Sequence, residues 1–342
     1  MKFKSILVLL VILSVSLTVF LSIQEWQSNN IKNVKLVINS NISSDSINSL
    51  ISSNLGIKTY PSFAWLAKQQ KVDFNKKIVI SVKPNTNVWN LLKMVKNYKA
   101  TSFDWVLRSS GTLPDVFQDI ILDYKKNTSN SKWQNNNLNF WFSTDSNYKV
   151  YGLTTQTAHC LFIANTYNLK SNYSPRDFLD RMYKESFGKF WNNQRKAAAE
   201  NNRLSVIDAV TLASIVTKES NATKEFGKIA SVYKLRLKKG MRLEADPTVV
   251  YARGRAGRVL LSDTKINSPY NTYQVNGLPP GPLCIPDTKA IDSVLFGANY
   301  PYLFFCAKPD NSGTHNFAVT LSEHNKNAKN YHQWLNNRGI QK

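Results

Sequence analysis

The segment that constrains the fold most is a helix whose inward face carries an acid. In "LSVIDAVTLASIVTKES", residues 204–220, the side chains of Leu212, Ile215 and Val216 recur at the spacing of one helix face. Glu219 follows seven residues after Leu212 and therefore lies on the same face. An apolar face of this kind packs on the core of a globular protein. The pattern thus predicts a core-facing helix that brings one carboxyl group with it.

The position of Glu219 has a chemical consequence. Burial raises the pKa of a carboxyl group, and so does the negative end of the helix dipole near the helix C-terminus. A raised pKa keeps the acid protonated near neutral pH, as a general acid requires. The neighbouring Lys218 points about 100° away around the helix and need not cancel this effect. The alternative is that Glu219 caps the helix or forms an ion pair at its end.

The first third of the chain has the pattern of a small mixed module. Alternating β-branched runs predict strands, and amphipathic runs with Ser, Asp or Pro near their starts predict helices. In chain order they are a strand in 33–41, helices in 43–54 and 60–71, a strand in 76–83 and a helix in 85–97. A polar, Asn-rich stretch at 127–147 then predicts a domain boundary or, alternatively, a long surface loop.

Helices dominate from about residue 150. Amphipathic patterns predict helices over 174–191, 205–220 and 224–240; the second has Ser205 as its N-cap and Asp208 in a capping box. Strands and Pro/Gly-rich loops follow Gly240, and a final helix starts near Ser322. The predicted fold class is therefore α+β, with a small βααβ module ahead of a larger mixed domain.

The N-terminus carries an uncharged apolar run from Ser5 to Ile23, about the length that spans a bilayer. Lys2 and Lys4 precede it, which places the start of the chain in the cytoplasm. A cleaved signal peptide is the alternative, since "SVS" at 14–16 resembles a cleavage site, but apolar residues continue after it. The run predicts an uncleaved single-pass anchor with the bulk of the chain outside the cytoplasm.

Charge and cysteine content narrow the function classes. Lys and Arg number 44 against 22 Asp and Glu, a net charge of +22 that indicates an anionic partner such as nucleic acid, an acidic membrane surface or an acidic polymer. No nucleic-acid-binding signature accompanies this charge. The three cysteines, Cys160, Cys284 and Cys306, have no CxxC spacing and are interpreted as buried thiols. The four histidines form no metal-binding motif; they are His159, His315, His324 and His332. We therefore expect neither a metal nor a cofactor.

Two further motifs admit a functional interpretation. "SVYK" at 231–234 matches the S-x-x-K of penicillin-binding enzymes, but the companion signatures occur in the wrong order, and Ser231 lies within an ordinary amphipathic helix. "RGRAGR" at 253–258 could bind phosphates, although it lacks the Lys-Ser/Thr of a P-loop. A solvated basic loop is the alternative for the second motif.

Five blocks in order give the sequence a family resemblance. They are "LASIVTKES", "GKIASVYKLRLKKGMRLEADPTVVYA", "SPYNTYQVNGLPPGP", "YLFFCAK" and "THNFAVTLSEHNKNAKNY". Together they resemble the endolytic murein transglycosylase family, also called YceG-like. The likeness is strong over about 150–340 and weaker over 33–125, where the βααβ order is similar to that family's LysM-like module.

The resemblance implies an enzyme that cuts peptidoglycan glycan strands internally between MurNAc and GlcNAc, leaves 1,6-anhydro-MurNAc ends and so terminates nascent strand elongation. The family's catalytic glutamate corresponds to Glu219, and a single such acid suits a lytic transglycosylase. The segments matching the family's cleft supply the expected substrate contacts: Asp246, Tyr270, Asn271, Tyr273, His315, Glu323 and His324.

The resemblance also implies an organisation and a location. Residues 1–4 would be a cytoplasmic tail, 5–23 a transmembrane anchor, 33–125 the LysM-like module and 150–342 the periplasmic catalytic domain. The protein would sit in the inner membrane, act on glycan strands and associate with peptidoglycan synthases, with no nucleic-acid partner.

Two departures from the family pattern stand out. The usual "EG-x-L-x-P-D-T-Y" reads "HCLFIANTY" here, so His159 replaces a glutamate and Asn165 an aspartate. Asn85 replaces a glycine of the N-terminal module. The alternatives of a muramidase that hydrolyses the same bond, a non-catalytic wall-binding scaffold and a tethered nucleic-acid binder stay open at this point.

Overall fold

A computed structural model describes residues 32–39, 42–57, 63–72, 74, 78–98, 102–128, 131–133 and 137–339. The predicted cytoplasmic tail at 1–4 and anchor at 5–23 lie outside these ranges. Within them, no helix combines the length and apolarity that a membrane span needs. The chain forms two compact units, one up to Phe103 with Lys170–Tyr173 added, the other made of Asp104–Leu169 and the residues from Ser174 onward.

The first unit has the strand–helix–helix–strand order that the sequence predicts, followed by one more helix. Its two strands pair antiparallel with Leu36 opposite Ile80, and their inward residues share one core with the helices. Asn87 caps the last helix by accepting a hydrogen bond from Asn90 N at 2.8 Å. The elements are β1 (Val34–Ile38), α2 (Ser44–Leu55), α3 (Phe63–Gln69), β2 (Ile78–Val82) and α4 (Val88–Lys96).

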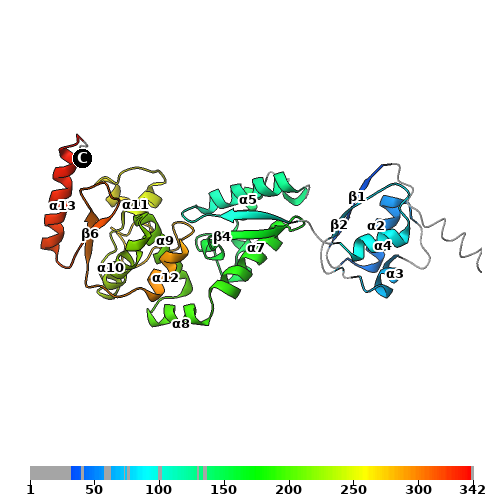
Figure 1. The fold of residues 1–342 in the computed structure, drawn as a ribbon, viewed down its shortest axis with the longest axis horizontal. Helices are drawn as coiled ribbons and strands as arrows, with labels where there is room; N and C mark the ends of the chain where they lie inside the picture. Colours follow the sequence, from blue (N-terminus) through cyan, green and yellow to red (C-terminus); the bar gives the residue numbers. More distant parts are fainter. Residues whose placement is uncertain are drawn as a thin grey trace, which may run out of the picture. The chain divides into compact units, whose positions relative to one another are not determined.

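The second unit begins with an aromatic core. Strands β3 and β4 form a two-stranded sheet, with α5 on one side and α7 on the other (Figure 1). Phe117 stacks on Phe142 at 4.3 Å between ring centroids, and Trp133 stacks on Tyr124 at 4.0 Å. The elements of this part are β3 (Ser102–Leu107), α5 (Leu113–Asn127), α6 (Leu138–Phe142), β4 (Asn165–Lys170) and α7 (Pro175–Tyr183).

This core explains where the compact units divide. Trp133 and Phe142 belong to the stretch at 127–147 that the sequence marks as a boundary, yet both are buried in the second unit. The division falls at 103/104 instead. The limits of the family modules, 33–125 and 150–342, stay a prediction. The helix predicted over 174–191 is α-helical only as α7 and winds as a π-helix over Lys184–Phe190.

The remainder of the second unit surrounds one buried helix. Helix α9 (Val206–Glu219) has the predicted capping box of Ser205 and Asp208, and every residue from Ala209 to Thr217 is buried. It packs against four other helices, α8, α10, α11 and α12 (Figure 1). Those helices are α8 (Asn193–Asn201), α10 (Phe226–Lys238), α11 (Asp246–Arg253) and α12 (Thr288–Phe296). The sequence prediction of a core-facing helix is confirmed.

A strand pair and one helix complete the fold. Strands β5 (Phe304–Ala307) and β6 (His315–Ala318) pair antiparallel with Phe305 opposite Phe317, and α13 (Leu321–Asn336) packs on both. Mixed helices and short sheets confirm the α+β class. The thiols of Cys160 and Cys284 are free and buried as predicted, whereas that of Cys306 is free and only partly buried.

Candidate active site

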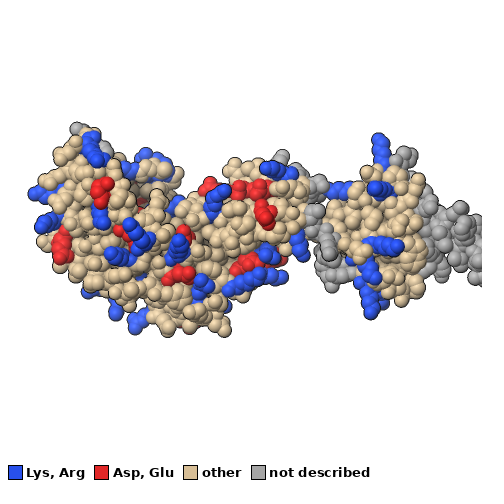
Figure 2. Space-filling model, in the orientation of Figure 1, with Lys and Arg blue, Asp and Glu red and all other residues tan. Residues whose placement is uncertain are grey.

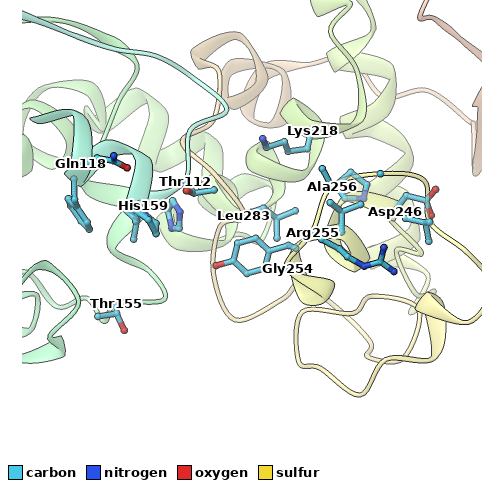
Figure 3. Close-up of a pocket in the computed structure, with 18 of the residues that line it drawn as sticks. Thr112, Gln118, Thr155, His159, Lys218, Asp246, Gly254, Arg255, Ala256 and Leu283 are labelled. Carbon is cyan, nitrogen blue, oxygen red and sulfur yellow. The ribbon is translucent and has the colours of Figure 1, made fainter. Parts of the chain in front are cut away.

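Glu219 is the last residue of α9 and lines a cleft of about 1170 Å³ in the second unit. The walls come from α5, the 139–159 segment, the end of α9, α11 and the loop at 254–259. Gln118, Thr155 and His159 lie on one wall, facing Asp246 and Arg255 on the other (Figure 3). A carboxyl group at the end of a buried helix is thus presented to an open, ligand-sized space.

Two backbone hydrogen bonds hold the walls together next to this space. Ser110 N donates to Ile285 O at 2.8 Å, and Ile285 N donates to Gly111 O at 2.9 Å. Lys218 adds a third link, because its Nζ reaches Ser110 O at 2.8 Å. Lys218 therefore directs its charge to the opposite wall.

The Glu219 carboxyl group is held by a tyrosine from the next helix. Tyr233 of α10 donates a hydrogen bond from its hydroxyl to Glu219 Oε1. Burial raises the pKa of Glu219 to about 7; the Tyr233 hydrogen bond and the Arg236 charge lower it in part, and Asp246 raises it further. Glu219 forms no ion pair with any residue that the structure describes. The alternative of an ion-paired helix end is therefore wrong.

Tyr233 is a site residue that the sequence analysis missed. The pattern of residues 224–240 predicts it to face inward, and a buried tyrosine needs a partner for its hydroxyl. That requirement was the available signal, but the partner depends on how α9 and α10 pack. Burial first, and the nearby Glu219 next, raise the pKa of Tyr233 well above its ordinary value. Tyr233 therefore stays a neutral hydrogen-bond donor.

A second carboxyl group faces the same cleft. Asp246, the first residue of α11, accepts a hydrogen bond from the Tyr273 hydroxyl at 2.8 Å. Beneath them, Arg236 is buried and donates to Leu303 O at 2.8 Å and to Glu244 Oε2 at 3.1 Å. Asp246 and Glu219 are the two predicted site residues that line the cleft, and Tyr273 is connected to it through Asp246.

His159 on the opposite wall is buried, at 3% exposure, and neither ring nitrogen has a well-formed hydrogen bond to the protein. Burial lowers the pKa of His159 to about 4, and the Gln156 backbone only partly offsets this shift. The imidazole is therefore neutral at physiological pH. No group of three metal-ligating side chains occurs in the described ranges.

The YceG-like family matches this chain over residues 34–330. The chain belongs to the YceG-like family. An endolytic murein transglycosylase of Bacillus subtilis is 42% identical over 137 residues, which are 40% of this chain and 38% of that protein. An endolytic murein transglycosylase of Streptococcus pneumoniae strain D39 is 28% identical over 172 residues, which are 48% of this chain and 30% of that protein. The chain thus spans less than two-fifths of the length of these curated relatives.

A crystal structure of a yceG-like protein from Listeria monocytogenes extends the comparison to the fold. It covers 87% of this chain and 99% of its own, with a TM-score of 0.53 and 25% sequence identity. The family resemblance that the five sequence blocks predict is therefore confirmed, and it extends beyond the cleft to most of the chain.

In this YceG-like chain, the "YNTY" segment supports the cleft wall from behind. Asn271 is fully buried and donates to Ile266 O at 2.8 Å and Thr264 O at 3.0 Å, while its own oxygen accepts Tyr273 N. Tyr270 is buried beside Tyr251, with 4.5 Å between ring centroids. Asn271 therefore braces the loop that presents Tyr273, and Tyr270 backs the cleft residue Tyr251.

The C-terminal predicted contacts lie in the β5–β6–α13 part of the fold. His315 pairs with Glu225 through Nδ1 at 2.9 Å, and Glu323 accepts hydrogen bonds from Val319 N and Thr320 N in the α13 capping box. His324 stacks on Phe304 with 5.3 Å between ring centroids. The structure gives each of the three a local partner and does not bring them to the cleft wall.

The serine-nucleophile alternative is wrong. Ser231 is buried and shares two hydrogen bonds with the Tyr300 backbone, while Lys234 Nζ donates to Asn202 Oδ1 and Val294 O at 3.1 Å. Neither side chain faces the other, so the pair has no activated hydroxyl.

Proposed function

We propose that this chain is a lytic transglycosylase that cleaves peptidoglycan glycan strands internally between MurNAc and GlcNAc. The observation that carries the proposal is a single glutamic acid, Glu219, set in a ligand-sized cleft with a pKa of about 7. Such an acid is protonated in a large fraction of molecules near neutral pH and can also act as a base. The curated relatives are named endolytic murein transglycosylases, which agrees with this chemistry.

The mechanism uses Glu219 twice. Its proton goes to the bridging oxygen as the C1–O bond of MurNAc breaks and positive charge develops at C1. The carboxylate then takes the proton of the C6 hydroxyl of the same sugar, and that oxygen bonds to C1. The products are a GlcNAc hydroxyl and a 1,6-anhydro end, with no water consumed. Because the nucleophile belongs to the reacting sugar, orientation supplies much of the rate.

The cleft suits an uncharged sugar chain along most of its length. Its volume exceeds the upper range of about 1000 Å³ that is typical of small-molecule pockets, which leaves room for an oligosaccharide. Gln118, Asn139 and Thr155 line it with neutral polar groups of the kind that hydrogen-bond to hydroxyl and acetamido groups. The neutral ring of His159 contributes to the same lining.

The proposed location follows from the N-terminal sequence. The apolar run 5–23 would anchor the chain in the inner membrane with its N-terminus in the cytoplasm, and the first unit would serve as a LysM-like module beside the catalytic domain in the periplasm. Its partners there would be nascent glycan strands, the inner membrane and peptidoglycan synthases. On the face shown in Figure 2, Lys and Arg are scattered and form no single large patch.

Hydrolysis by a muramidase is the second candidate, and Asp246 is the observation that favours it. A second carboxylate in the cleft could activate a water to attack C1, as in glycosidases that use two acids. Product mass separates the two candidates.

The test uses the full-length chain and uncrosslinked glycan strands, with the products analysed by mass spectrometry. A lytic transglycosylase gives ends lighter by one water than the hydrolytic ends, and this is the expected result. Reducing ends would establish the muramidase instead. Intact strands would leave the wall-binding scaffold as the surviving hypothesis.

A further inference from the structure

The basic loop "RGRAGR" lines the cleft but has no part in the proposed chemistry. Arg255, Ala256, Gly257, Arg258 and Val259 all line the same cleft as Asp246. Figure 3 shows Arg255 and Ala256 on the side of Asp246. The loop starts where α11 ends, and α11 starts at Asp246. The eight residues of α11 span about 12 Å, so the loop begins about 12 Å from Asp246.

Arg253 holds this loop in one shape. Its guanidinium donates to three carbonyl groups of the loop, those of Gly257 at 2.6 Å, Arg258 at 2.9 Å and Arg255 at 3.2 Å. It also pairs with Asp263, and the two side chains are only 5% and 10% exposed. Asp263 in turn accepts Leu260 N at 2.9 Å, which fixes the far end of the loop. A loop braced in this way pays little ordering cost when a ligand binds.

The two glycines of the motif allow this shape. Gly254 has φ of +72° and Gly257 has φ of +114°, in the left-handed region that favours glycine. Their conformations let the backbone fold around the Arg253 guanidinium while Arg255 and Arg258 stay exposed. The spacing of the motif therefore separates one structural arginine from two that are exposed along the cleft.

The charge of these two arginines matches one part of the proposed substrate. A guanidinium group recognises carboxylates through paired, charge-assisted hydrogen bonds. Arg255 forms no ion pair with the residues that the structure describes. The alternating sugars of the glycan backbone are uncharged, so its negative charge resides on the carboxylates of the stem peptides that the MurNAc lactyl groups carry.

We propose that Arg255 and Arg258 form a carboxylate subsite for a stem peptide, in the same cleft as the sugar whose bond is cleaved. This inference rests on the proposed function for its substrate and deepens it, because it makes strands that carry peptides the preferred ligands. Arg253 is the positioning residue that presents the pair.

The test measures binding without turnover. The full-length Glu219→Gln chain is titrated with uncrosslinked glycan that carries stem peptides and with the same glycan after carbodiimide coupling to excess methylamine has converted its peptide carboxylates to neutral amides. Arg255→Ala/Arg258→Ala is added to this background, and Lys238→Ala/Lys239→Ala, exposed at the end of α10, is the charge-matched control. Both double variants are compared with the parent by thermal unfolding to show that the fold is intact.

We expect the parent and the control to bind strands with free peptide carboxylates roughly tenfold more tightly than the amidated strands, and the arginine variant to bind both with similar affinity. A preference that survives in the arginine variant, or its absence in the parent, overturns the inference. Failure of the proposed function is a separate result, since it shows as intact strands in the wild-type digestion, whatever the binding preference is.

Discussion

The Tyr233 hydroxyl donates a hydrogen bond to Glu219 Oε1, across the packed interface of α10 and α9. This bond stabilises the ionised form of the carboxyl group and opposes the effect of burial on the pKa of Glu219. It also fixes one oxygen of a carboxyl group that lines the cleft. Tyr233 therefore sets both the orientation of the proposed acid and its proton affinity.

Tyr233→Phe is expected to shift the pH profile of cleavage. Removing the donor disfavours the carboxylate, so the pKa of Glu219 rises and the alkaline limb of the profile moves up by roughly one pH unit. The measurement is the rate of anhydro-end formation between pH 5 and 9. Tyr331→Phe, on α13, is the control and should leave the profile unchanged. An unshifted limb in Tyr233→Phe would show that the bond does not tune Glu219.

The raised pKa of Glu219 also predicts how stability depends on pH. The pKa is about 7 in the folded chain against an ordinary value of 4.5, so the folded state binds more protons between these values. Unfolding free energy therefore falls as pH rises through this window, and the loss is complete above pH 7. Glu219→Gln removes the loss and should stabilise the second unit by about 1–3 kcal/mol at pH 8, with little effect at pH 4. Thermal unfolding of both proteins at the two pH values measures it; an equal shift at both would contradict the account.

The lowered pKa of His159 predicts that the free energy of unfolding changes with pH in the opposite direction, at lower pH. Its pKa is about 4 in the folded chain against an ordinary 6.5, so the unfolded state binds more protons between these values. Stability contributed by the neutral imidazole is present above pH 6.5 and is lost as pH falls toward 4. His159→Gln should reduce the acid-induced fall in unfolding free energy by about 1–3 kcal/mol. Urea unfolding at pH 7 and pH 4.5 checks this, and identical slopes with pH in variant and parent would refute it.

Gly281 lies so close to the Gln156 backbone that the cleft should depend on its lack of a side chain. A Cβ there would lie 2.2 Å from Gln156 O, in the segment that carries Thr155 and His159. Gly281→Ala must therefore displace that backbone, and we expect a loss of about 1–3 kcal/mol in stability together with slower cleavage. Gly227→Ala in α10 meets no atom within 4 Å and should be neutral or slightly stabilising. If Gly281→Ala has the thermal stability and the cleavage rate of the wild type, the close contact between Gly281 and Gln156 is not needed.

Local features were predictable from the sequence, and long-range ones were not. The period of residues 204–220 and the capping pair Ser205 and Asp208 predict both the helix and the position of Glu219 within it, because each signal acts within a few residues. The Tyr233–Glu219 bond depends on the packing of two helices, which no local pattern encodes.

The opposite wall was missed for a similar reason. Residues 110–111, beside the wall that carries His159, pair with Ile285, some 175 positions later in the chain, and no local pattern encodes that pairing. Asn271 was predicted to contact substrate, but the structure uses its amide to brace a loop. Short polar residues serve loops and ligands with the same hydrogen bonds, so residue type alone does not separate the two roles.

The most direct test of the account is the product analysis of Glu219→Gln. This substitution keeps the size of the side chain and an oxygen that can accept a hydrogen bond from the Tyr233 hydroxyl, but it removes the ionisable proton of the carboxyl group. The full-length variant and the wild type are incubated with uncrosslinked glycan strands, and 1,6-anhydro ends are counted by mass spectrometry. The account predicts abundant anhydro ends from the wild type and a loss of at least about 100-fold in the variant. Anhydro ends formed by the variant at the wild-type rate would contradict it.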